Sequence, residues 1–476
     1  MDKSFHDFVY NNYNPEEGAG LKGAIDLKTA NLIIKFFNND IKKEIESIIV
    51  HDQILSINQF NCKIKNMNFG ISNYSYNKVK IFFEANDKIH IRLNDIQGWG
   101  IFNISLALLL FNYEDNISFQ INNLKVESTV KIKSKNVNGK LLPDAEIIYL
   151  NYDYNFDFNF NLNRNVDNVI SIIKQPIKNL IRKEINKVID GQINRGLQIG
   201  LSMIPNEIII NKNKGYAIDY SLISTPYIEN NYILFNSYAR FINKNIKETL
   251  NKDNYFRPFL VPSYDLIGKS SQIYISDYVI NTALFTFFKS RDLEILITPD
   301  MLPKNLPIIK LTTSWLGIIF KNLSDVYGSD IPVNIKIIVC ENPQLILKEK
   351  FISFILNTNI EVMVQGFQGI AVKFRTTFFV DATLKVLENC KISGKIENLN
   401  IKNTKIIWSY TEDENFGKNV ESQFNLLKGI ALPFINIFVL KNIDFNLPNI
   451  RGIKFTDMTI SHHENFIIVN YNFQYN

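Results

Sequence analysis

The sequence is poor in cysteine. Its 476 residues include only Cys62, Cys340 and Cys390, which lie far apart and match no metal-ligand spacing. An odd number leaves at least one of them unpaired or bonded to another molecule, so a framework of disulfides is excluded. This scarcity argues against secretion, although a large chain needs disulfides less than a small secreted domain does.

Long apolar runs are also missing. The closest candidates, residues 101–111 and 430–440, are interrupted and fall short of the roughly 18 to 20 residues that cross a membrane. The first 20 residues are polar and lack the apolar core of a signal peptide. We therefore expect no spanning helix, and either an intracellular protein or one whose signal was removed before this numbering begins.

No excess of one charge sign marks the chain. It carries 52 Lys and Arg against 47 Asp and Glu, a formal net charge of +5 that is spread over both halves. Nucleic-acid-binding domains concentrate far more positive charge, so we expect no nucleic-acid partner. With 46% hydrophobic residues, the chain has enough material for two or three domains with sizeable cores.

Catalytic signatures are absent as well. No GxSxG, HExxH, Walker loop or CxxC pattern occurs in the sequence. His462 and His463 are adjacent, so on a strand they face opposite ways and cannot share a metal ion. We predict no enzymatic activity, no metal site and no cofactor.

One segment, residues 150–162, alternates almost without fault between aromatic and polar side chains. Side chains of a strand leave opposite faces with period two, so this segment predicts one strand with an aromatic face and a polar face. At about 3.3 Å per residue it spans roughly 40 Å, which is typical of a large curved sheet. The aromatic face comprises Tyr152, Tyr154, Phe156, Phe158 and Phe160.

Two amphipathic helices are predicted in the first half, and each carries an apolar stripe at intervals of three and four residues. The second covers residues 167–203, and we expect Pro176 to kink it or to begin a new segment. A long helix in the hollow of a tall sheet encloses an elongated apolar interior, which indicates a lipid ligand. The stripes are Leu27, Ala30, Ile34, Phe37, Ile41, Ile45 and Ile48 in the first helix, and Ile173, Ile177, Leu180, Ile181, Ile185, Val188 and Ile189 in the second.

The same order of elements occurs twice along the chain. Residues 244–268 lose periodicity and contain Pro258 and Pro262, which predicts a linker. After it, Ser276 is placed to cap a helix, strands follow from 293 to about 408, and another helix begins near 418. We predict an N-terminal barrel with part of a central sheet (1–243), the linker, and a C-terminal barrel with the rest of that sheet (269–476).

Several segments resemble one known family. GYAIDYSLISTP (215–226) is similar to the hallmark stretch of the bactericidal/permeability-increasing and lipopolysaccharide-binding protein family, which includes the plasma lipid-transfer proteins. The first helix also fits, with GLKGAIDLKTANLI (20–33). Four further segments agree in order and spacing: ISDYVINTALF (275–285), PDMLPKNLPIIKLTTSWLG (299–317), LPFINIFVLKNIDFNLP (432–448) and HHENFIIVNYNFQY (462–475).

The resemblance implies an α+β fold of two elongated barrels in a boomerang shape, joined by a central sheet. In each barrel a twisted antiparallel sheet wraps around a long helix, and an apolar pocket holds the acyl chains of a phospholipid. It also implies export, to the outside of the cell or to an endomembrane lumen, whereas the polar N-terminus leaves the cytosol open.

Three departures from the family pattern are visible. The disulfide usual in the N-terminal domain is missing, because Ala145 and residues 185–190 occupy its two regions without cysteine. The loop that is basic in bactericidal members corresponds here to residues 98–111, which carry no charge. The other tip hairpin keeps Lys131, Lys133 and Lys135 on one strand face. Lipopolysaccharide binding is thereby placed in doubt, but lipid carriage is not.

Two sets of candidate site residues follow, each with an ordinary structural alternative. The pocket candidates are core residues in most proteins, and within this family they divide between core and pocket wall. They are Leu27, Ile34, Phe37, Ile41, Ile173, Ile177, Ile181, Ile280, Leu284, Phe287, Ile430, Phe434 and Ile437.

The second set concerns the tip of the N-terminal arm. Trp99 with Phe102 is either a buried hairpin pair or an exposed aromatic tip that enters the membrane interface. Lys131, Lys133 and Lys135 are either the solvated face of a strand or a site for anionic headgroups.

The sequence as a whole predicts a protein that binds a phospholipid or related amphipathic lipid, for transfer or presentation, and that meets membrane surfaces peripherally. The alternative is an antibacterial, innate-defence effector that binds lipopolysaccharide.

Overall fold

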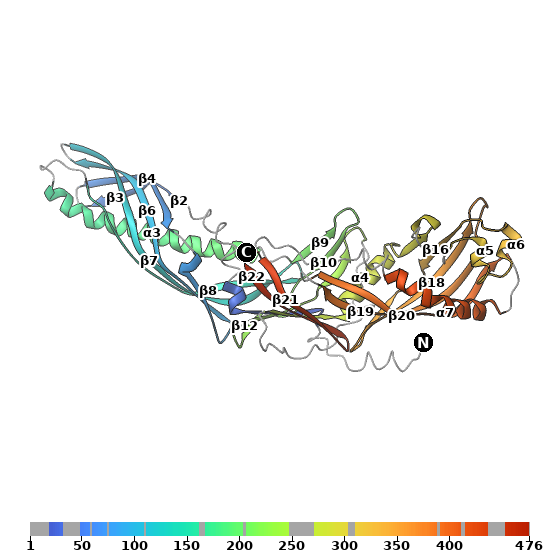
Figure 1. The fold of residues 1–476 in the computed structure, drawn as a ribbon. Coiled ribbons are helices and arrows are strands. Elements are labelled where there is room, and N and C mark those ends of the chain that lie inside the picture. The colour runs from blue at the N-terminus through green and yellow to red at the C-terminus, as the bar shows by residue number, and fades with distance from the viewer. Residues whose placement is uncertain are drawn as a thin grey trace.

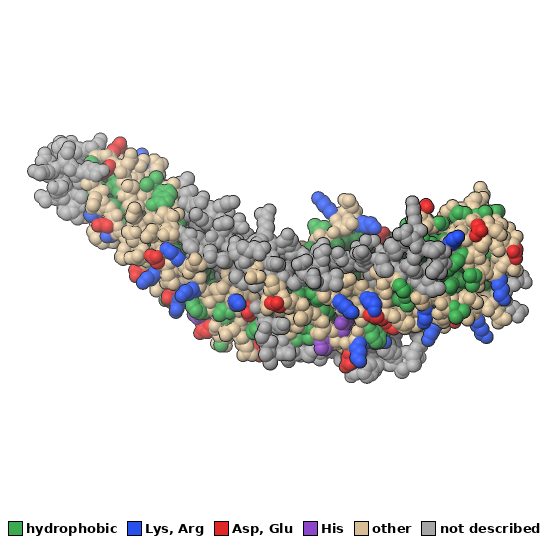
Figure 2. All heavy atoms as spheres, in the orientation of Figure 1, with side chains coloured by type: hydrophobic (Ala, Val, Ile, Leu, Met, Phe, Trp, Pro, Cys, Tyr) green, Lys and Arg blue, Asp and Glu red, His purple; other side chains and the backbone are tan. Residues whose placement is uncertain are grey.

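The computed structural model describes residues 19–31, 48–57, 60–73, 76–108, 111–160, 167–202, 206–246, 271–302, 310–387, 391–410, 415–436 and 453–475. The molecule has one arm on each side of a central sheet (Figure 1), and its outline is elongated and bent (Figure 2). Its described part is mostly antiparallel strands with a few helices, which confirms the predicted α+β class.

The N-terminal arm is a single curled sheet around one long helix (Figure 1). The helix, α3 (Asp167–Ser202), continues through Pro176, so no new segment begins there. The sheet follows the order β2-β4-β6-β7-β8, with β3 beside β4 and β5 beside β6. Its strands are β2 (Ile48–Val50), β3 (Gln53–Ile57), β4 (Phe60–Asn73), β5 (Val79–Glu84), β6 (Lys88–Leu108), β7 (Phe111–Val137) and β8 (Lys140–Asp157).

Aspartate and asparagine bulges bend these long strands. The register between β6 and β7 shifts twice. Asp95 of β6 lies in the shift between Leu93 and Ile96, Asn123 of β7 lies in the shift between Ile96 and Gly98, and both take left-handed backbone angles. Asn and Asp tolerate that conformation better than other residues with a Cβ. A bulge increases local twist, so these positions help to curl the sheet.

Asn138 and Gly139 form a tight turn between β7 and β8. Val137 pairs with Lys140 across it, and both turn residues have positive φ, at 53° and 79°. The predicted first helix is only partly described: residues 27–31 are helical, residues 32–47 lie outside the described part, and Ile48 already belongs to β2. Its end was therefore placed too late.

The central sheet combines strands from both halves of the chain, in the order β11-β12-β1-β14-β22-β21. β1 lies between a strand of the first half and a strand of the second half, since Leu21 pairs with both Ser237 and Ile275. The strands are β1 (Leu21–Asp26), β11 (Tyr227–Glu229), β12 (Tyr232–Ser237), β14 (Ser271–Ser276), β21 (Ile453–His463) and β22 (Phe466–Tyr475).

A small three-stranded sheet of order β13-β10-β9 lies beside the central sheet (Figure 1). Its strands are β9 (Glu207–Asn211), β10 (Tyr216–Asp219) and β13 (Arg240–Asn243). Helix α4 (Asp277–Lys289) packs against it. Ser276 stands at the N-cap of α4 as predicted, but its hydroxyl bonds the carbonyl of Gly20 rather than the helix.

The C-terminal arm repeats the arrangement of a sheet with a helix. Its sheet has the order β15-β16-β18-β19-β20, with β17 beside β18, and α7 packs on β20. Its elements are β15 (Glu294–Ile297), β16 (Val333–Val339), β17 (Gln344–Leu347), β18 (Ile352–Val364), β19 (Val372–Leu387), β20 (Lys391–Ser409), α5 (Thr313–Leu316), α6 (Leu323–Tyr327) and α7 (Phe416–Ile435). Most of the predicted linker, 247–268, lies outside the described residues.

Two neighbouring residues of α3 allow a test of which face of the helix packs against the sheet. Ile173 is fully buried and its neighbour Ile172 is 54% exposed. Ile173→Ala should lower the free energy of unfolding of this arm by about 2–5 kcal/mol, because it leaves a cavity. Ile172→Ala should change it by less than about 0.5 kcal/mol. Urea unfolding of the two variants measures this, and equal losses would contradict the assigned face of the helix.

Candidate lipid-binding site

The interior of the N-terminal arm is a continuous apolar stack between β8 and α3. Successive inward rings of β8 lie close together, with centroids 6.0 Å apart for Tyr154 and Phe156 and 6.5 Å apart for Phe156 and Phe158. Three predicted pocket residues face this stack from α3 and are fully buried: Ile173, Ile177 and Ile181. Hydrophobic burial along this line is what holds the helix to the sheet.

Three cations of α3 lie over the same rings. Lys174, Lys178 and Arg182 are spaced by four residues, so they share one side of the helix. Their charged groups lie 5.9 Å from the ring of Phe158, 5.6 Å from that of Phe156 and 5.5 Å from that of Tyr154, respectively. The seam between helix and strand is thus apolar inside and positively charged at its rim.

Tyr154 of β8 is hydrogen-bonded to α3. Its hydroxyl donates to Asn186 Oδ1 at 2.7 Å and lies 3.2 Å from the carbonyl oxygen of Arg182. Burial raises the pKa of Tyr154 well above its ordinary value, and the charge of Arg182 opposes only part of that rise. The phenol therefore stays protonated and remains a donor at physiological pH.

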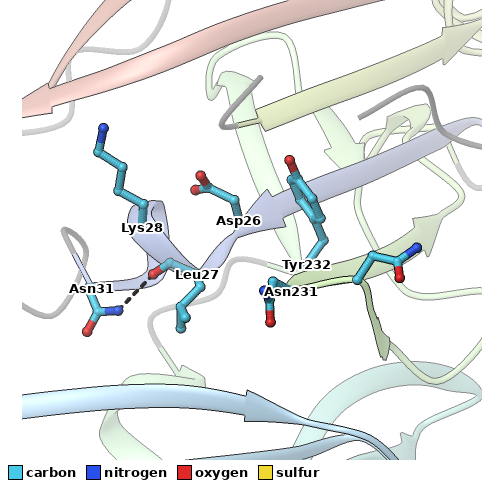
Figure 3. Close-up of a pocket in the computed structure, with 7 residues that line it drawn as sticks. Asp26, Leu27, Lys28, Asn31, Asn231 and Tyr232 are labelled. Atoms are coloured by element: carbon cyan, nitrogen blue, oxygen red, sulfur yellow. Dashed lines mark hydrogen bonds between the residues drawn. The ribbon is translucent and has the colours of Figure 1, made fainter. Parts of the chain in front are cut away.

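A pocket of about 490 Å³ opens where β1 ends, next to the β11–β12 turn (Figure 3). Asp26, Lys28 and Tyr232 extend to one side of the chain there, and Leu27 extends to the other (Figure 3). Leu27 was predicted to line a pocket, whereas the others were not. The lining is Asp26, Leu27, Lys28, Asn31, Asn230, Asn231 and Tyr232.

Hydrogen bonds fix the backbone around this pocket. Asp26 Oδ1 accepts from the backbone N–H of Thr29 at 2.7 Å. Asn31 donates to the carbonyl of Leu27 at 2.9 Å and accepts from the N–H of Ile81, at 3.2 Å, on β5. The start of the helix is therefore tied to the N-terminal sheet, and the positions of the pocket residues are set before any ligand arrives.

The hallmark segment, residues 215–226, joins the two halves of the chain. Tyr216 donates to Asp292 Oδ2 at 2.5 Å, and Lys214 lies 2.8 Å from the same oxygen. Within the segment, the side chain of Asp219 is 1% exposed and lies 3.2 Å from both Lys140 and Arg240. The segment is thus a structural junction between β10, the β7–β8 hairpin and the end of α4.

Comparison with known proteins assigns the family. The sequence profile described as "LBP / BPI / CETP family, C-terminal domain" matches residues 210–475, more than half of the chain. The chain belongs to the LBP/BPI/CETP family. Proteins of this family are generally lipid-binding and non-enzymatic.

Individual relatives are distant. The lipopolysaccharide-binding protein of Oryctolagus cuniculus is 27% identical over 284 residues, which are 54% of this chain and 52% of that protein. The match thus spans about half the length of that curated relative. A crystal structure of lipopolysaccharide binding protein aligns with 96% of this chain and 99% of its own, at 16% identity and a TM-score of 0.47. P47 of Clostridium botulinum E1 aligns over 96% and 99%, at 10% identity and a TM-score of 0.32.

The remaining pocket candidates of this LBP/BPI/CETP family member are spread over several environments. Ile280 and Leu284 on α4 are partly buried against the cluster of β17, β21 and β22. Phe287 packs edge-on against Tyr216, with ring centroids 4.9 Å apart. Ile430 and Phe434 are on α7, but their side chains are not described. Ile34, Phe37, Ile41 and Ile437 lie outside the described residues. Pocket contact for this set stays a prediction.

The structure corrects the expectation that Trp99 and Phe102 act as a pair. Phe102 is 1% exposed and packs on Phe119 and Phe158 inside the arm, so it does not reach a membrane. Trp99 is half-buried and has the opposite parity on β6, which places it on the other face. The two residues are therefore neither a buried pair nor a joint tip.

The three tip lysines lie on the solvated face of a strand, which is one of their two predicted alternatives. Lys131, Lys133 and Lys135 are exposed on one face of β7 as predicted, but Lys133 pairs with Glu146, and Lys135 with Asp144 at 3.4 Å. Their hairpin does not form a free tip, because Leu141 bridges Leu222 next to the central sheet. Two of the three lysines therefore have acidic partners.

Apart from Leu27, the residues that line the pocket were not predicted from the sequence. The dipeptide Asn230-Asn231 was the one local pattern that indicated a turn there, since both residues have positive φ in a tight turn between β11 and β12.

Two further findings concern only the described part of the chain: it holds no group of three or more His, Cys, Asp or Glu suited to a metal, and no helix both long and apolar enough to cross a membrane.

Asp219 makes the junction sensitive to acid. Burial alone raises the pKa of its carboxyl, but hydrogen bonds from Ser221 and from Lys140, together with the charge of Lys140, outweigh burial and lower it below the usual value. Asp219→Asn should therefore cost about 1–3 kcal/mol of unfolding free energy at pH 6. The cost should shrink below about pH 4 and vanish once the pH passes through the lowered pKa, because the wild-type carboxyl is then neutral too.

Unfolding curves of wild type and Asp219→Asn at pH 6 and pH 3 measure this difference. Asp300→Asn, on an exposed carboxylate, is the matched control and should show no loss at either pH. A loss for Asp219→Asn of equal size at both pH values would contradict the ionic origin.

Proposed function

We propose that this protein binds a phospholipid or related amphipathic lipid and carries it for transfer or presentation. The observation that carries the proposal is its membership of the LBP/BPI/CETP family, a family of generally lipid-binding and non-enzymatic proteins. The elongated apolar interior along α3 supports it, because acyl chains are long, narrow and fully apolar.

The proposed mechanism is passive. Burial of an acyl chain contributes about 0.8 kcal/mol per CH₂, so two tails supply ample affinity without a covalent or metal-assisted step. The protein meets a membrane peripherally, the tails enter an arm first, and the headgroup stays near water at the opening. Each half, residues 1–243 and 269–476, forms one such arm in this proposal.

The alternative function, lipopolysaccharide binding with an antibacterial role, is favoured by one observation, the likeness to the rabbit lipopolysaccharide-binding protein. The acidic partners of Lys133 and Lys135 argue against a cationic tip of the kind that lipopolysaccharide would need.

We also propose a secreted or endomembrane-lumenal location, and this proposal rests on the family alone.

Lipid extraction followed by mass spectrometry of the purified protein tests the proposal. We expect co-purified phospholipid that survives washing at about 1 M salt, roughly a sevenfold rise over physiological ionic strength, because hydrophobic retention is not screened by salt. A transfer assay between donor and acceptor vesicles then separates transfer from storage.

The alternative predicts the opposite pattern. Recovery of no phospholipid, together with tight binding of lipopolysaccharide that weakens steeply with salt, would replace lipid carriage with the defence role. Neutralising Lys131, Lys133 and Lys135 together is the matched test of that role, and lipid carriage predicts no change in retained phospholipid.

A further inference from the structure

A hairpin of the small sheet projects from the inner side of the bend and carries exposed apolar side chains. Strands β9 and β10 form this hairpin, and β9 is an edge strand of its sheet (Figure 1). Three consecutive residues of β9, Ile208, Ile209 and Ile210, are 39%, 55% and 52% exposed. Single exposed apolar residues are ordinary, but a run of three on a projecting hairpin forms a patch that indicates an interaction surface.

A bulge makes this edge a poor template for a further strand. The register between β9 and β10 shifts between Tyr216 and Ala217, which leaves Ile210 without a partner on β10. Edge strands that are short and bulged resist pairing with another strand, and β9 has five residues. The isoleucines are therefore better suited to a partner that buries side chains without extending the sheet.

Positive charge surrounds the isoleucines. The hairpin, β13 and the end of α4 (206–219, 240–246 and 289–292) carry six Lys and Arg against three Asp and Glu. Figure 2 shows Lys and Arg side chains on both sides of the projection, with hydrophobic side chains beneath them. Each of the three carboxylates already has a basic partner. The pairs are Glu207 with Lys244, Asp219 with Arg240, and Asp292 with Lys214. A surface that combines apolar area with excess positive charge matches an anionic lipid membrane.

Hydrogen bonds hold the hairpin against the rest of the molecule. The backbone N–H of Lys244 donates to the carbonyl of Gly215 at 2.8 Å, which ties β13 to the β9–β10 turn. The side-chain amide of Asn243 donates to Ser290 Oγ, at 2.9 Å, at the end of α4. The projection is therefore formed before any contact, so little conformational entropy is lost when it binds a surface.

We propose that the β9–β10 hairpin docks the protein on an anionic membrane surface. Ile208, Ile209 and Ile210 enter the interface, and Lys212, exposed in the turn, lies against anionic headgroups. The proposal rests on the lipid-binding function proposed above and names the surface through which the protein meets a membrane.

The double variant Ile209→Ser/Ile210→Ser tests the apolar part of this contact. Both residues are exposed, so the change should leave the fold intact. The full-length protein is sedimented with vesicles of phosphatidylcholine alone, or of equal parts of phosphatidylcholine and phosphatidylserine. We expect wild type to bind the mixed vesicles more tightly. The double variant should lower the partition coefficient on both by about tenfold, because two isoleucines no longer leave water on binding.

Ile172→Ser/Leu426→Ser is the matched control for that variant. It removes two apolar residues that are 54% and 71% exposed, one from α3 and one from α7, and it should bind vesicles as wild type does. An equal loss in the control and in the hairpin variant would overturn the proposal, since any exposed apolar residue would then serve.

Lys212→Gln tests the electrostatic part. It should lower binding to the mixed vesicles by about fivefold, the effect of one lysine near an anionic surface, and leave binding to phosphatidylcholine alone unchanged. The difference should shrink at high salt, which screens exposed charges. Lys405→Gln, on an exposed lysine of β20, is the control and should change neither. A loss of equal size on both kinds of vesicle would overturn the role of Lys212.

The outcomes separate this inference from the proposed function. Wild type that retains co-purified phospholipid but binds neither kind of vesicle would overturn the docking surface and leave lipid carriage intact. Wild type that binds vesicles through the hairpin but holds no lipid would support the docking surface and overturn carriage. A wild-type dimer that Ile209→Ser/Ile210→Ser converts to a monomer would show an interface between two copies of the chain and overturn the docking surface.

Discussion

The burial of one aromatic strand face beneath one helix is the constraint on which the N-terminal arm depends. β8 is the last strand of its sheet, so no neighbouring strand covers its outer edge within the described residues. Burying a Phe side chain is worth about 1.5–3 kcal/mol, and Phe156 and Phe158 are almost fully buried under α3. The helix therefore has to follow the strand, and the strand's length gives the arm its long, narrow interior.

The centre of the molecule depends on a different principle, the pairing of backbone groups across the two halves. β1 is bonded on one side to β12 and on the other to β14, which is 250 residues away in the chain. Side chains of α4 extend this connection: the hydroxyl of Thr282 accepts from the N–H of Phe241, and Thr286 donates to the carbonyl of Phe241. Since neither half completes the sheet alone, the two arms share one rigid junction.

How much of this could be predicted depends on whether the signal is local. The period-two alternation of β8 and the stripe of α3 are local patterns, and the burial of the side chains confirms both. The bounds of the strand differ from the predicted 150–162, since β8 begins at Lys140 and ends at Asp157. The family resemblance placed Phe102 in a loop, whereas it lies within the 21-residue strand β6 and is buried, as one of its two predicted alternatives had it. The bulges at Asp95 and Asn123 could not be predicted either, because the sequence contains many other Asn residues and only strand register selects those that bend the sheet.

The location of the lysines shows the same limit. Their spacing correctly predicted one exposed strand face, but their acidic partners Glu146 and Asp144 come from β8, and pairing across a hairpin depends on register. The pocket depended on contacts further apart still. Asp26 and Tyr232 are 206 residues apart in sequence, and they are neighbours because β1 and β12 pair directly.

An apolar interior has a consequence for any lipid carrier. A tail that leaves a membrane for an apolar interior exchanges one apolar environment for another, so its net free energy of transfer is small and varies little between lipids with equal chains. The gain of about 0.8 kcal/mol per CH₂ applies against water, and it keeps the lipid from escaping into solution without distinguishing one headgroup from another. Selection among lipids must therefore come from polar contacts to the headgroup rather than from the tails.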